Sequence, residues 1–310
     1  MSTYRQLKGY NIKSISSDPA NAQIGQVWYN DTLKKIKVRT QVTAAWASGG
    51  NLGTARYGLQ GGGTQTAALA AGGSGPDKTL SEEYNGSAWT EGNNLNTGRD
   101  TLGGAGTQTA GLVFAGYVDQ PNGNTANVEE YNGTSWAEQN NLPAICAQVS
   151  GCGTQTAGLK CQGSPDAGTE EYDGTNWTAG GDLNTARYNG GTAGTQTAAV
   201  TAGGGDNASN HSEEYNGTAW TEGNNLNNSR KNFSGAGIQT AAIMFGGSPS
   251  AVEQYNGTSY TAIADLATAR QFPASAGTGS IALASGGKGP TAATEEFTEI
   301  AANTQSLDVS

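Results

Sequence analysis

The chain has 310 residues, a net charge of −10 and no apolar run long enough to span a bilayer, so we expect no membrane insertion. Only 14% of the residues are charged and 48 are glycine, a composition that alone would suit a disordered chain, but the internal repetition described below favours a folded one. The three cysteines lie in one repeat and the single histidine lies in another, so we expect reduced thiols, no metal and no other cofactor.

The first 41 residues form a basic arm. Residues 1–40 carry seven lysines and arginines against two aspartates, whereas the rest carries nine against 24 acidic residues. Because most of the surface is therefore acidic, we expect no nucleic-acid partner. Residues 26–38 predict a β-hairpin, and the opening segment lacks the apolar core of an export signal. We expect the arm to anchor the protein to an acidic partner surface through Lys34, Lys35, Lys37 and Arg39.

From residue 46 onward, one pattern recurs six times. Tyr-Asn-Gly or a variant is followed five residues later by an aromatic residue, and ten residues after that by Arg in five of the six copies. Seven residues further on, a glycine opens Gly-Thr-Gln-Thr or a variant, and ten more residues reach the end of a small-residue run. The distance from this run to the next Tyr or Phe varies from 8 to 15 residues, so one loop carries nearly all of the length variation.

Each copy predicts four short strands. Strand a follows the Arg, strand b ends at the small-residue run, strand c holds Glu-Glu-Tyr and strand d holds the Trp. Asn-Gly between c and d is a strong hairpin signal, because a type I′ turn needs positive φ at both central residues. Gly and Ala suit the crowded centre of a radial array of sheets, and Tyr and Trp suit its wider periphery. The sequence therefore predicts an all-β, six-bladed propeller with four antiparallel strands per blade.

The two ends of the repeat region complement each other. The last copy has strand c at residues 294–297 but no aromatic residue five positions later, whereas Trp46 has no c strand before it. We therefore expect residues 42–47 to supply the outer strand of the last blade, which leaves no open edge. The predicted domains are the arm, residues 1–41, and the propeller, residues 42–310; a seventh blade built from the arm is the alternative.

The glycine doublet followed by spaced aromatic residues, as in Gly72-Gly73, Tyr84 and Trp89, resembles the kelch repeat over residues 46 to about 298. In detail, with Gly-Thr-Gln-Thr-Ala and Glu-Glu-Tyr-Asn-Gly, the chain is similar to kelch-like virion proteins of marine tailed bacteriophages. Residues 25–37 are similar to a hairpin common near the start of phage fibre and tail proteins. The resemblance implies a non-enzymatic structural protein of the virion, made in the host cytoplasm and associated with the tail or fibre.

Two functions fit this resemblance. In the first, the arm binds other virion proteins and the propeller binds a glycan or protein of the host surface. In the second, the protein is an architectural capsid or tail decoration protein that contacts only other virion subunits. A cellular kelch adaptor is disfavoured, because the 41-residue arm cannot hold a partner domain.

The b–c loops are the predicted recognition surface, because loops accept changes in length that strands do not. The loop of the second copy is the longest, and its aromatic, amide and carboxylate side chains suit a polar glycan or a protein epitope. A drifted loop without a ligand is the alternative. The candidate ligand-binding residues of these loops are Tyr117, Asp119, Gln120, Asn122, Asn124, Asp77, Asp166, Asp206 and His211.

The repeated arginine is a second candidate. A ring of guanidiniums near the start of strand a could bind an anionic sugar or a carboxylate. The alternative is that each arginine pairs with a Glu of the Glu-Glu doublets and locks neighbouring blades together, as a feature of nearly every repeat usually does. The doublet does not predict a glycosidase, because adjacent strand residues point to opposite faces. The five arginines are Arg56, Arg99, Arg187, Arg230 and Arg270.

Overall fold

The computed structural model describes residues 3–7, 10–19, 25–39, 44–119, 123–164, 168–248, 250–289, 291–299 and 304–307. All regular elements in these ranges are β-strands, and none of the ranges contains a helix able to cross a membrane. The chain divides into two compact units, a smaller one formed by Met1–Ala45 with Glu299–Ser310 and a larger one formed by Trp46–Thr298.

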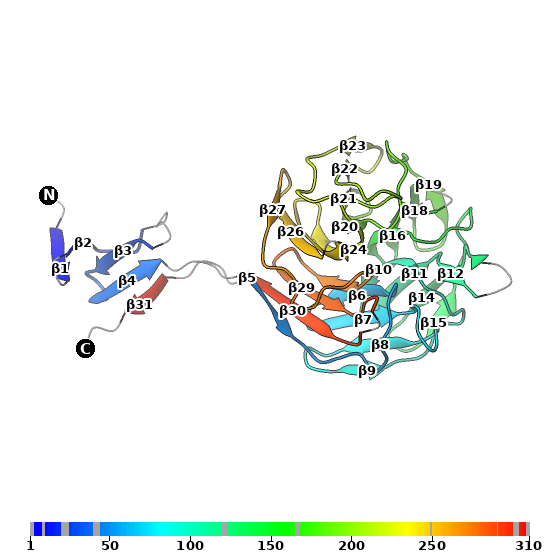
Figure 1. Ribbon diagram of the computed structural model, residues 1–310, viewed down its shortest axis with the longest axis horizontal. Coiled ribbons are helices and arrows are strands. Elements are labelled where there is room, and N and C mark those ends of the chain that lie inside the picture. Colours follow the sequence, from blue (N-terminus) through cyan, green and yellow to red (C-terminus); the bar gives the residue numbers. More distant parts are fainter. Residues whose placement is uncertain are drawn as a thin grey trace. The chain divides into compact units, whose positions relative to one another are not determined.

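The described part of the larger unit contains six four-stranded sheets, shown in Figure 1. The first comprises β6 (Gln60–Thr64), β7 (Ala67–Ala71), β8 (Ser81–Tyr84) and β9 (Trp89–Glu91), and the second β10 (Gly103–Thr107), β11 (Ala110–Phe114), β14 (Val128–Tyr131) and β15 (Trp136–Glu138). The third comprises β16 (Ser150–Thr154), β17 (Ala157–Cys161), β18 (Glu170–Tyr172) and β19 (Trp177–Ala179), and the fourth β20 (Gly191–Thr195), β21 (Ala198–Ala202), β22 (Ser212–Tyr215) and β23 (Trp220–Glu222). The fifth comprises β24 (Lys231–Ile238), β25 (Ala241–Ser248), β26 (Ala251–Tyr255) and β27 (Tyr260–Ala262), and the sixth β28 (Ala274–Gly277), β29 (Ile281–Ser285), β30 (Thr294–Glu299) and β5 (Ala44–Ser48). A two-stranded ribbon, β12 (Tyr117–Val118) with β13 (Gly123–Asn124), lies in the loop between β11 and β14.

The c–d hairpins form at Asn-Gly, but the predicted type I′ turn is wrong: β8 and β9 pair from Tyr84 and Trp89, so the loop has four residues, and only its glycine has a positive φ. In the first sheet the Oδ1 of Asn85 accepts hydrogen bonds from the backbone N–H groups of Ser87 and Ala88, at 3.0 and 2.9 Å, and Gly86 has a φ of +88°. Asp173 makes the same two bonds in the third sheet, to Thr175 and Asn176. A carboxylate therefore replaces the amide there without changing the turn.

The innermost strands contact one another in the order β6, β10, β16, β20, β24, β28 and back to β6. Near the start of each, one residue has a left-handed backbone with φ between +50° and +64°, and its N–H donates to the carbonyl of the corresponding residue of the sheet before it, at 2.7 to 3.1 Å. The cycle closes where Gly58 donates to Phe272. Non-glycine residues such as Thr101 rarely adopt this conformation, and the bonds of the cycle hold them in it. The six residues are Gly58, Thr101, Gln148, Asn189, Asn232 and Phe272.

Small residues lie near the centre of this cycle and aromatic residues lie at its periphery. A Cβ on Gly61 of β6 would stand 2.3 Å from the carbonyl oxygen of Ser275 on β28, so only glycine permits this approach of two inner strands. On the outer strands, Tyr84 and Trp89 pack with ring centroids 5.0 Å apart, and equivalent pairs recur in the next four sheets. The arrangement is compatible with a β-propeller.

The sixth sheet takes its outermost strand from the N-terminal side of the repeats. β5 lies beside β30, the position expected for residues 42–47, of which 42 and 43 lie outside the described residues. The Trp46 ring lies 5.2 Å from that of Phe297 and 5.3 Å from that of Phe245 in the fifth sheet. Its Nε1 donates to the carbonyl of Ala264 at 3.1 Å. One strand thus completes its own sheet and contacts the neighbouring one.

The smaller unit is a five-stranded sheet in the order β1 (Thr3–Leu7), β2 (Tyr10–Ile15), β3 (Val27–Asn30), β4 (Lys35–Arg39) and β31 (Thr304–Leu307). β3 and β4 form the predicted hairpin, while β2 and β3 are parallel. Trp28 is buried, and its Nε1 donates to Asp18 at 2.9 Å.

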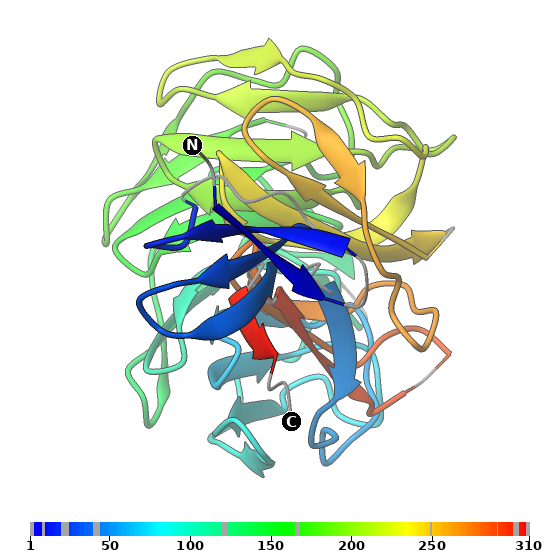
Figure 2. The same ribbon diagram turned by 90° about the vertical axis from the view of Figure 1, so that its left-hand side faces the viewer.

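The chain returns to this sheet at its C-terminal end, since β31 pairs antiparallel with β4, as the red strand beside the blue ones in Figure 2 indicates. Residues after 298 therefore cluster with the arm and not, as the boundary 42–310 implied, with the repeats. An otherwise open edge of β4 supplies the physical reason.

We predict that a chain of residues 44–299 stays folded and that a chain of residues 51–299 melts at a lower temperature. The shorter chain lacks β5, so β30 becomes an open edge and the rings of Phe245 and Phe297 lose Trp46. Loss of a packed Trp corresponds to about 2 kcal/mol or more of unfolding free energy. Thermal unfolding followed by circular dichroism measures the difference, and equal melting temperatures would contradict the closing role of β5.

Candidate functional site

The loops between strands b and c lie beside the connections that run from one sheet to the next. Backbone bridges join Tyr57 to Ser74 and Asp100 to Tyr117, and equivalent bridges occur farther round the cycle. We call the surface formed by the loops β7–β8, β11–β14, β17–β18, β21–β22, β25–β26 and β29–β30 the b–c face. It is the face on which the candidate ligand-binding residues were predicted.

A hollow of about 490 Å³ opens on the b–c face between the loops of the first and second sheets. Lys78 lines it, with its Nζ 2.8 Å from a carboxylate oxygen of Asp100 and 2.8 Å from one of Asp119. The same ammonium lies 5.3 Å from the centre of the Tyr117 ring. Partial burial opposes the charge of Lys78, but the hydrogen bonds to the two carboxylates prevail and raise its pKa. The hollow therefore holds a fixed cation between two loops.

Anionic groups surround this cation. Asp77 is exposed, and its Oδ1 accepts hydrogen bonds from the Oγ1 and N–H of Thr79, at 2.6 and 2.8 Å, which lower its pKa. The side chain of Asp119 is 78% exposed, and Tyr117 presents part of its ring to solvent. Carboxylates, an ammonium, hydroxyls and an aromatic face together suit a polar ligand.

Of the other predicted residues, those within the described ranges do not join this group. Asp206 accepts a hydrogen bond from the hydroxyl of Tyr188 in the loop of the fourth sheet, where His211 is exposed. Asn124 donates to the carbonyl of Ser164 at 3.0 Å. Gln120, Asn122 and Asp166 lie outside the described residues. Lys78 and Asp100 were not predicted, although Lys78 is the only cation in the b–c loop of its copy.

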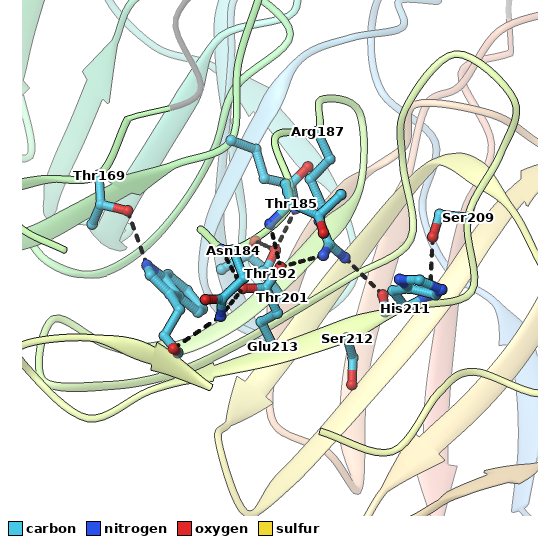
Figure 3. A network of polar contacts seen from close by, with 12 residues as sticks. Thr169, Asn184, Thr185, Arg187, Thr192, Thr201, Ser209, His211, Ser212 and Glu213 are labelled. Carbon is cyan, nitrogen blue, oxygen red and sulfur yellow. Dashed lines mark hydrogen bonds and ion pairs between the residues drawn. The ribbon is translucent and has the colours of Figure 1, made fainter. Parts of the chain in front are cut away.

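The five repeated arginines are buried, with side chains 0 to 3% exposed, and therefore present no ring of guanidiniums to an external ligand. Each pairs with a glutamate of strand c, as the alternative expected, but the pair lies within one sheet and does not itself join neighbouring sheets, and Glu253, the partner of Arg230, belongs to no Glu-Glu doublet. Figure 3 shows Arg187 directed at Glu213 and at the carbonyl of His211. The pairs are Arg56 with Glu82, Arg99 with Glu129, Arg187 with Glu213, Arg230 with Glu253 and Arg270 with Glu295.

The same glutamates hold the connection that arrives from the sheet before. Glu129 accepts hydrogen bonds from the backbone N–H groups of Asn96 and Thr97, at 2.7 and 3.2 Å, in addition to its pair with Arg99 at 2.9 Å. Glu213 does the same with Asn184 and Thr185. A single buried carboxylate thus joins a strand, an arginine and the crossing between two sheets.

In the third copy Cys146 stands in place of the arginine, and the glutamate, Glu170, pairs with a lysine from a different strand. The Nζ of Lys160, on β17, lies 2.9 Å from Glu170 and donates to the carbonyl of Gly168 at 2.8 Å. Lys160 is fully buried. The sequence shows the missing arginine, but the replacement comes from another strand and only the fold reveals it.

The second glutamate of each doublet binds the neighbouring sheet. The hydroxyl of Tyr131 donates to Glu83 at 2.6 Å, and that of Tyr84 donates to Glu296 at 2.6 Å across the junction of the first and sixth sheets. At the junction of the fifth and sixth sheets both partners change: Phe297 has no hydroxyl and Gln254 donates to the carbonyl of Gly279 at 2.8 Å. The equivalent bonds elsewhere are Tyr172 to Glu130, Tyr215 to Glu171 and Tyr255 to Glu214.

The three cysteines are buried in the third sheet and its neighbourhood. Cys146, Cys152 and Cys161 form no disulfide, and burial raises the pKa of Cys161 to about 11, which keeps it a thiol. Within the described ranges no group of three or more His, Cys, Asp or Glu side chains could hold a metal ion.

The basic residues of the arm lie on the β3–β4 hairpin. Lys34 and Lys35 are exposed, Lys37 is half-buried, and the backbone of Arg39 pairs with Thr304.

No family model and no curated protein matches the chain.

We predict that Lys160→Met lowers the unfolding free energy by about 3–5 kcal/mol, because it leaves the carboxylate of Glu170 buried without its cation. The exposed Lys288→Met is the matched control and should change stability by less than about 0.5 kcal/mol. Adding Cys146→Arg to Lys160→Met should recover part of the loss by restoring the pair found in the other sheets. Urea unfolding measures all three, and equal effects of the two lysine variants would contradict the assignment.

We predict that stability falls between pH 10 and 12 as tyrosine hydroxyls ionise. Burial and the hydrogen bond to Glu171 raise the pKa of Tyr215 to about 12. Its contribution is therefore complete below the unfolded pKa of about 10 and is lost as the pH rises toward 12. Tyr215→Phe should weaken this pH dependence, whereas Tyr57→Phe, whose hydroxyl makes no hydrogen bond within the described chain, should not. Urea unfolding at pH 8, 10 and 11 tests this, and identical pH dependence in both variants would refute it.

Proposed function

We propose that the protein is a non-enzymatic structural protein of a tailed-phage virion, associated with the tail or fibre, whose six-bladed propeller of kelch type attaches the particle to the host surface. The observation that carries the attachment role is the polar hollow around Lys78 on the b–c face. The virion assignment rests on the resemblance of the repeats to kelch-like phage proteins.

Six sheets with repeated spacing and a cyclic order of inner strands support the propeller. In such a fold every blade restrains its neighbours, so a loop at the rim can change without disturbing the strands. The longest b–c loop, between β11 and β14, contributes Asp119 to the hollow and places the Tyr117 ring beside Lys78. This combination of a rigid scaffold and a variable polar loop favours recognition of an external ligand.

The chemistry of the hollow favours a polar ligand, either a glycan or a protein epitope of the host. The carboxylates of Asp119 and Asp77 can accept hydrogen bonds from hydroxyl or amide groups of a ligand. The exposed part of the Tyr117 ring offers a surface on which a ligand can stack. Because Lys78 is already engaged by two carboxylates, an anionic ligand would have to displace one of them. A neutral polar ligand fits better.

The arm supports a separate role in assembly. Lys34, Lys35 and Lys37 lie on one hairpin of a small sheet, apart in sequence from the acidic repeats. Charged residues at such a surface accelerate binding to an acidic partner, and salt weakens it. We therefore assign anchoring on other virion proteins to the arm.

Two variants test the two roles. Replacing residues 118–124 by a short Gly-Ser link removes Asp119 from the hollow and should leave incorporation into particles unchanged but reduce attachment to host cells at least tenfold. Reversing the charge at Lys34, Lys35 and Lys37 should prevent incorporation while the repeats stay folded. The readouts are the amount of protein in purified particles, adsorption of particles to cells, and circular dichroism. Unchanged adsorption with the loop variant would favour the architectural alternative, in which the propeller contacts only virion subunits.

A further inference from the structure

A second hollow, of about 500 Å³, lies between the first and second sheets, where β9 and the start of the connection after it face the c–d turn of the second sheet. Its floor is the pair formed by the hydroxyl of Tyr131 and the carboxylate of Glu83, and its rim includes Glu91 on β9 and the c–d turn of the second sheet. Glu91 is exposed, and its side chain makes no hydrogen bond to any described residue. The lining residues are Glu83, Thr90, Glu91, Gly92, Asn93, Tyr131, Gly133 and Thr134.

The same eight residue types recur at one other junction, between the fourth and fifth sheets. They are Glu214, Thr221, Glu222, Gly223, Asn224, Tyr255, Gly257 and Thr258. The hydrogen bonds recur as well: Asn93 donates to the carbonyl of Thr134 at 2.5 Å and Asn224 to that of Thr258 at 2.6 Å. Because three sheets separate the two junctions in either direction round the cycle, the two sets lie on opposite sides of it.

Asn93, and Asn224 at the equivalent position, lie between the connection that follows strand d and the c–d turn of the next sheet. At the junction of the third and fourth sheets a glycine, Gly181, stands at this position, and a Cβ there would lie 2.3 Å from the carbonyl oxygen of Thr218. At the junction of the sixth and first sheets Gly50 stands in the same place, with a Cβ 2.1 Å from the carbonyl oxygen of Ser87. The connection touches the turn directly at these junctions, whereas Asn93 and Asn224 hold the two apart.

Gly92 has no side chain to cover the hydroxyl of Tyr131 at the bottom of the hollow. A Cβ on Gly92 would lie 3.3 Å from the hydroxyl oxygen of Tyr131, and Gly223 stands equivalently above Tyr255. At the junction of the second and third sheets Gln139 occupies this position, so a long side chain replaces the open space. The asparagine that separates the connection from the turn and the glycine that leaves the tyrosine hydroxyl uncovered thus occur together at two junctions.

We infer that the hollow at the first junction and a corresponding hollow formed by the recurring residues at the fourth–fifth junction are equivalent binding sites for a neutral, polyhydroxylated ligand such as a short glycan. The volume lies within the range of small-ligand sites. The carboxylates of Glu83 and Glu91 can accept short, charge-assisted hydrogen bonds from hydroxyl groups. No lysine or arginine is among the lining residues of the described hollow, so its charge disfavours an anionic ligand. Two such sites on opposite sides would strengthen binding to a surface that presents many copies of the ligand.

This inference does not depend on the b–c face or on the virion assignment. It predicts that maltose, lactose or cellobiose shifts the methyl resonances of labelled threonines near both hollows in the full-length protein, whereas a disaccharide carrying a uronic acid shifts them at least tenfold less at equal concentration. Thr90→Arg should abolish the response of the first site, Thr221→Arg that of the second, and the double variant both. Thr178→Arg, at the corresponding exposed position of a junction without the asparagine, is the matched control and should leave both responses intact.

Asn93→Gly provides a milder test, because it removes the asparagine side chain without filling the hollow. It should weaken binding at the first site at least tenfold and leave the second unchanged, with the fold verified by its melting temperature. The inference is overturned if none of the three neutral disaccharides shifts these resonances, if the double arginine variant still responds, or if the uronic acid binds more strongly.

Discussion

A buried carboxylate at every crossing between sheets is the interaction on which the rest of the larger unit depends. Glu129 shows why: it accepts from Arg99 and from two backbone N–H groups of the crossing segment, so its charge is neutralised and the crossing has partners for its donors. A carboxylate left alone in this environment would cost several kcal/mol. The position therefore tolerates loss of the arginine only where another cation arrives, as Lys160 does in the third sheet. With each crossing fixed in this way, the loops of the b–c face begin and end at defined places.

The second carboxylate of the doublet turns a set of separate sheets into a closed cycle. Tyrosine hydroxyls bind it across five junctions, including the one where Tyr84 reaches Glu296 and joins the first sheet to the sixth. At the remaining junction Phe297 and Gln254 depart from the pattern together, and Trp46 contributes an aromatic contact instead. Adjacent side chains of one strand point to opposite faces, so one glutamate serves its own sheet and the other serves the next. The geometry that argues against a glycosidase thus provides the two-sided connection.

Structural features that recur in every copy of the repeat could be predicted from the sequence, and features that occur only once could not. The positions of the strands, the Asn-Gly hairpins and the outer strand supplied by Trp46 and its neighbours all follow from repeated spacings. The pairing of β31 with β4 involves two segments outside the repeat, and no spacing links them. Lys78 and Asp119 belong to loops of different copies, 41 positions apart, and their contact depends on how two sheets approach. The hollow beside Glu83 and Glu91 depends on a glycine and an asparagine at two adjacent positions, Gly92 and Asn93, whose effect appears only when the neighbouring turn is placed.

The pairing of β31 with β4 has a mechanical consequence. The chain enters the larger unit through β5, which follows β4, and leaves it through β30, which precedes β31. β4 pairs with β31, and β5 lies beside β30, so the incoming and outgoing strands are neighbours in both units. A pulling force applied to the smaller unit is therefore divided between two strands of the same sheet. Hydrogen bonds between those strands resist it jointly, in place of one terminal strand peeling away from the cycle.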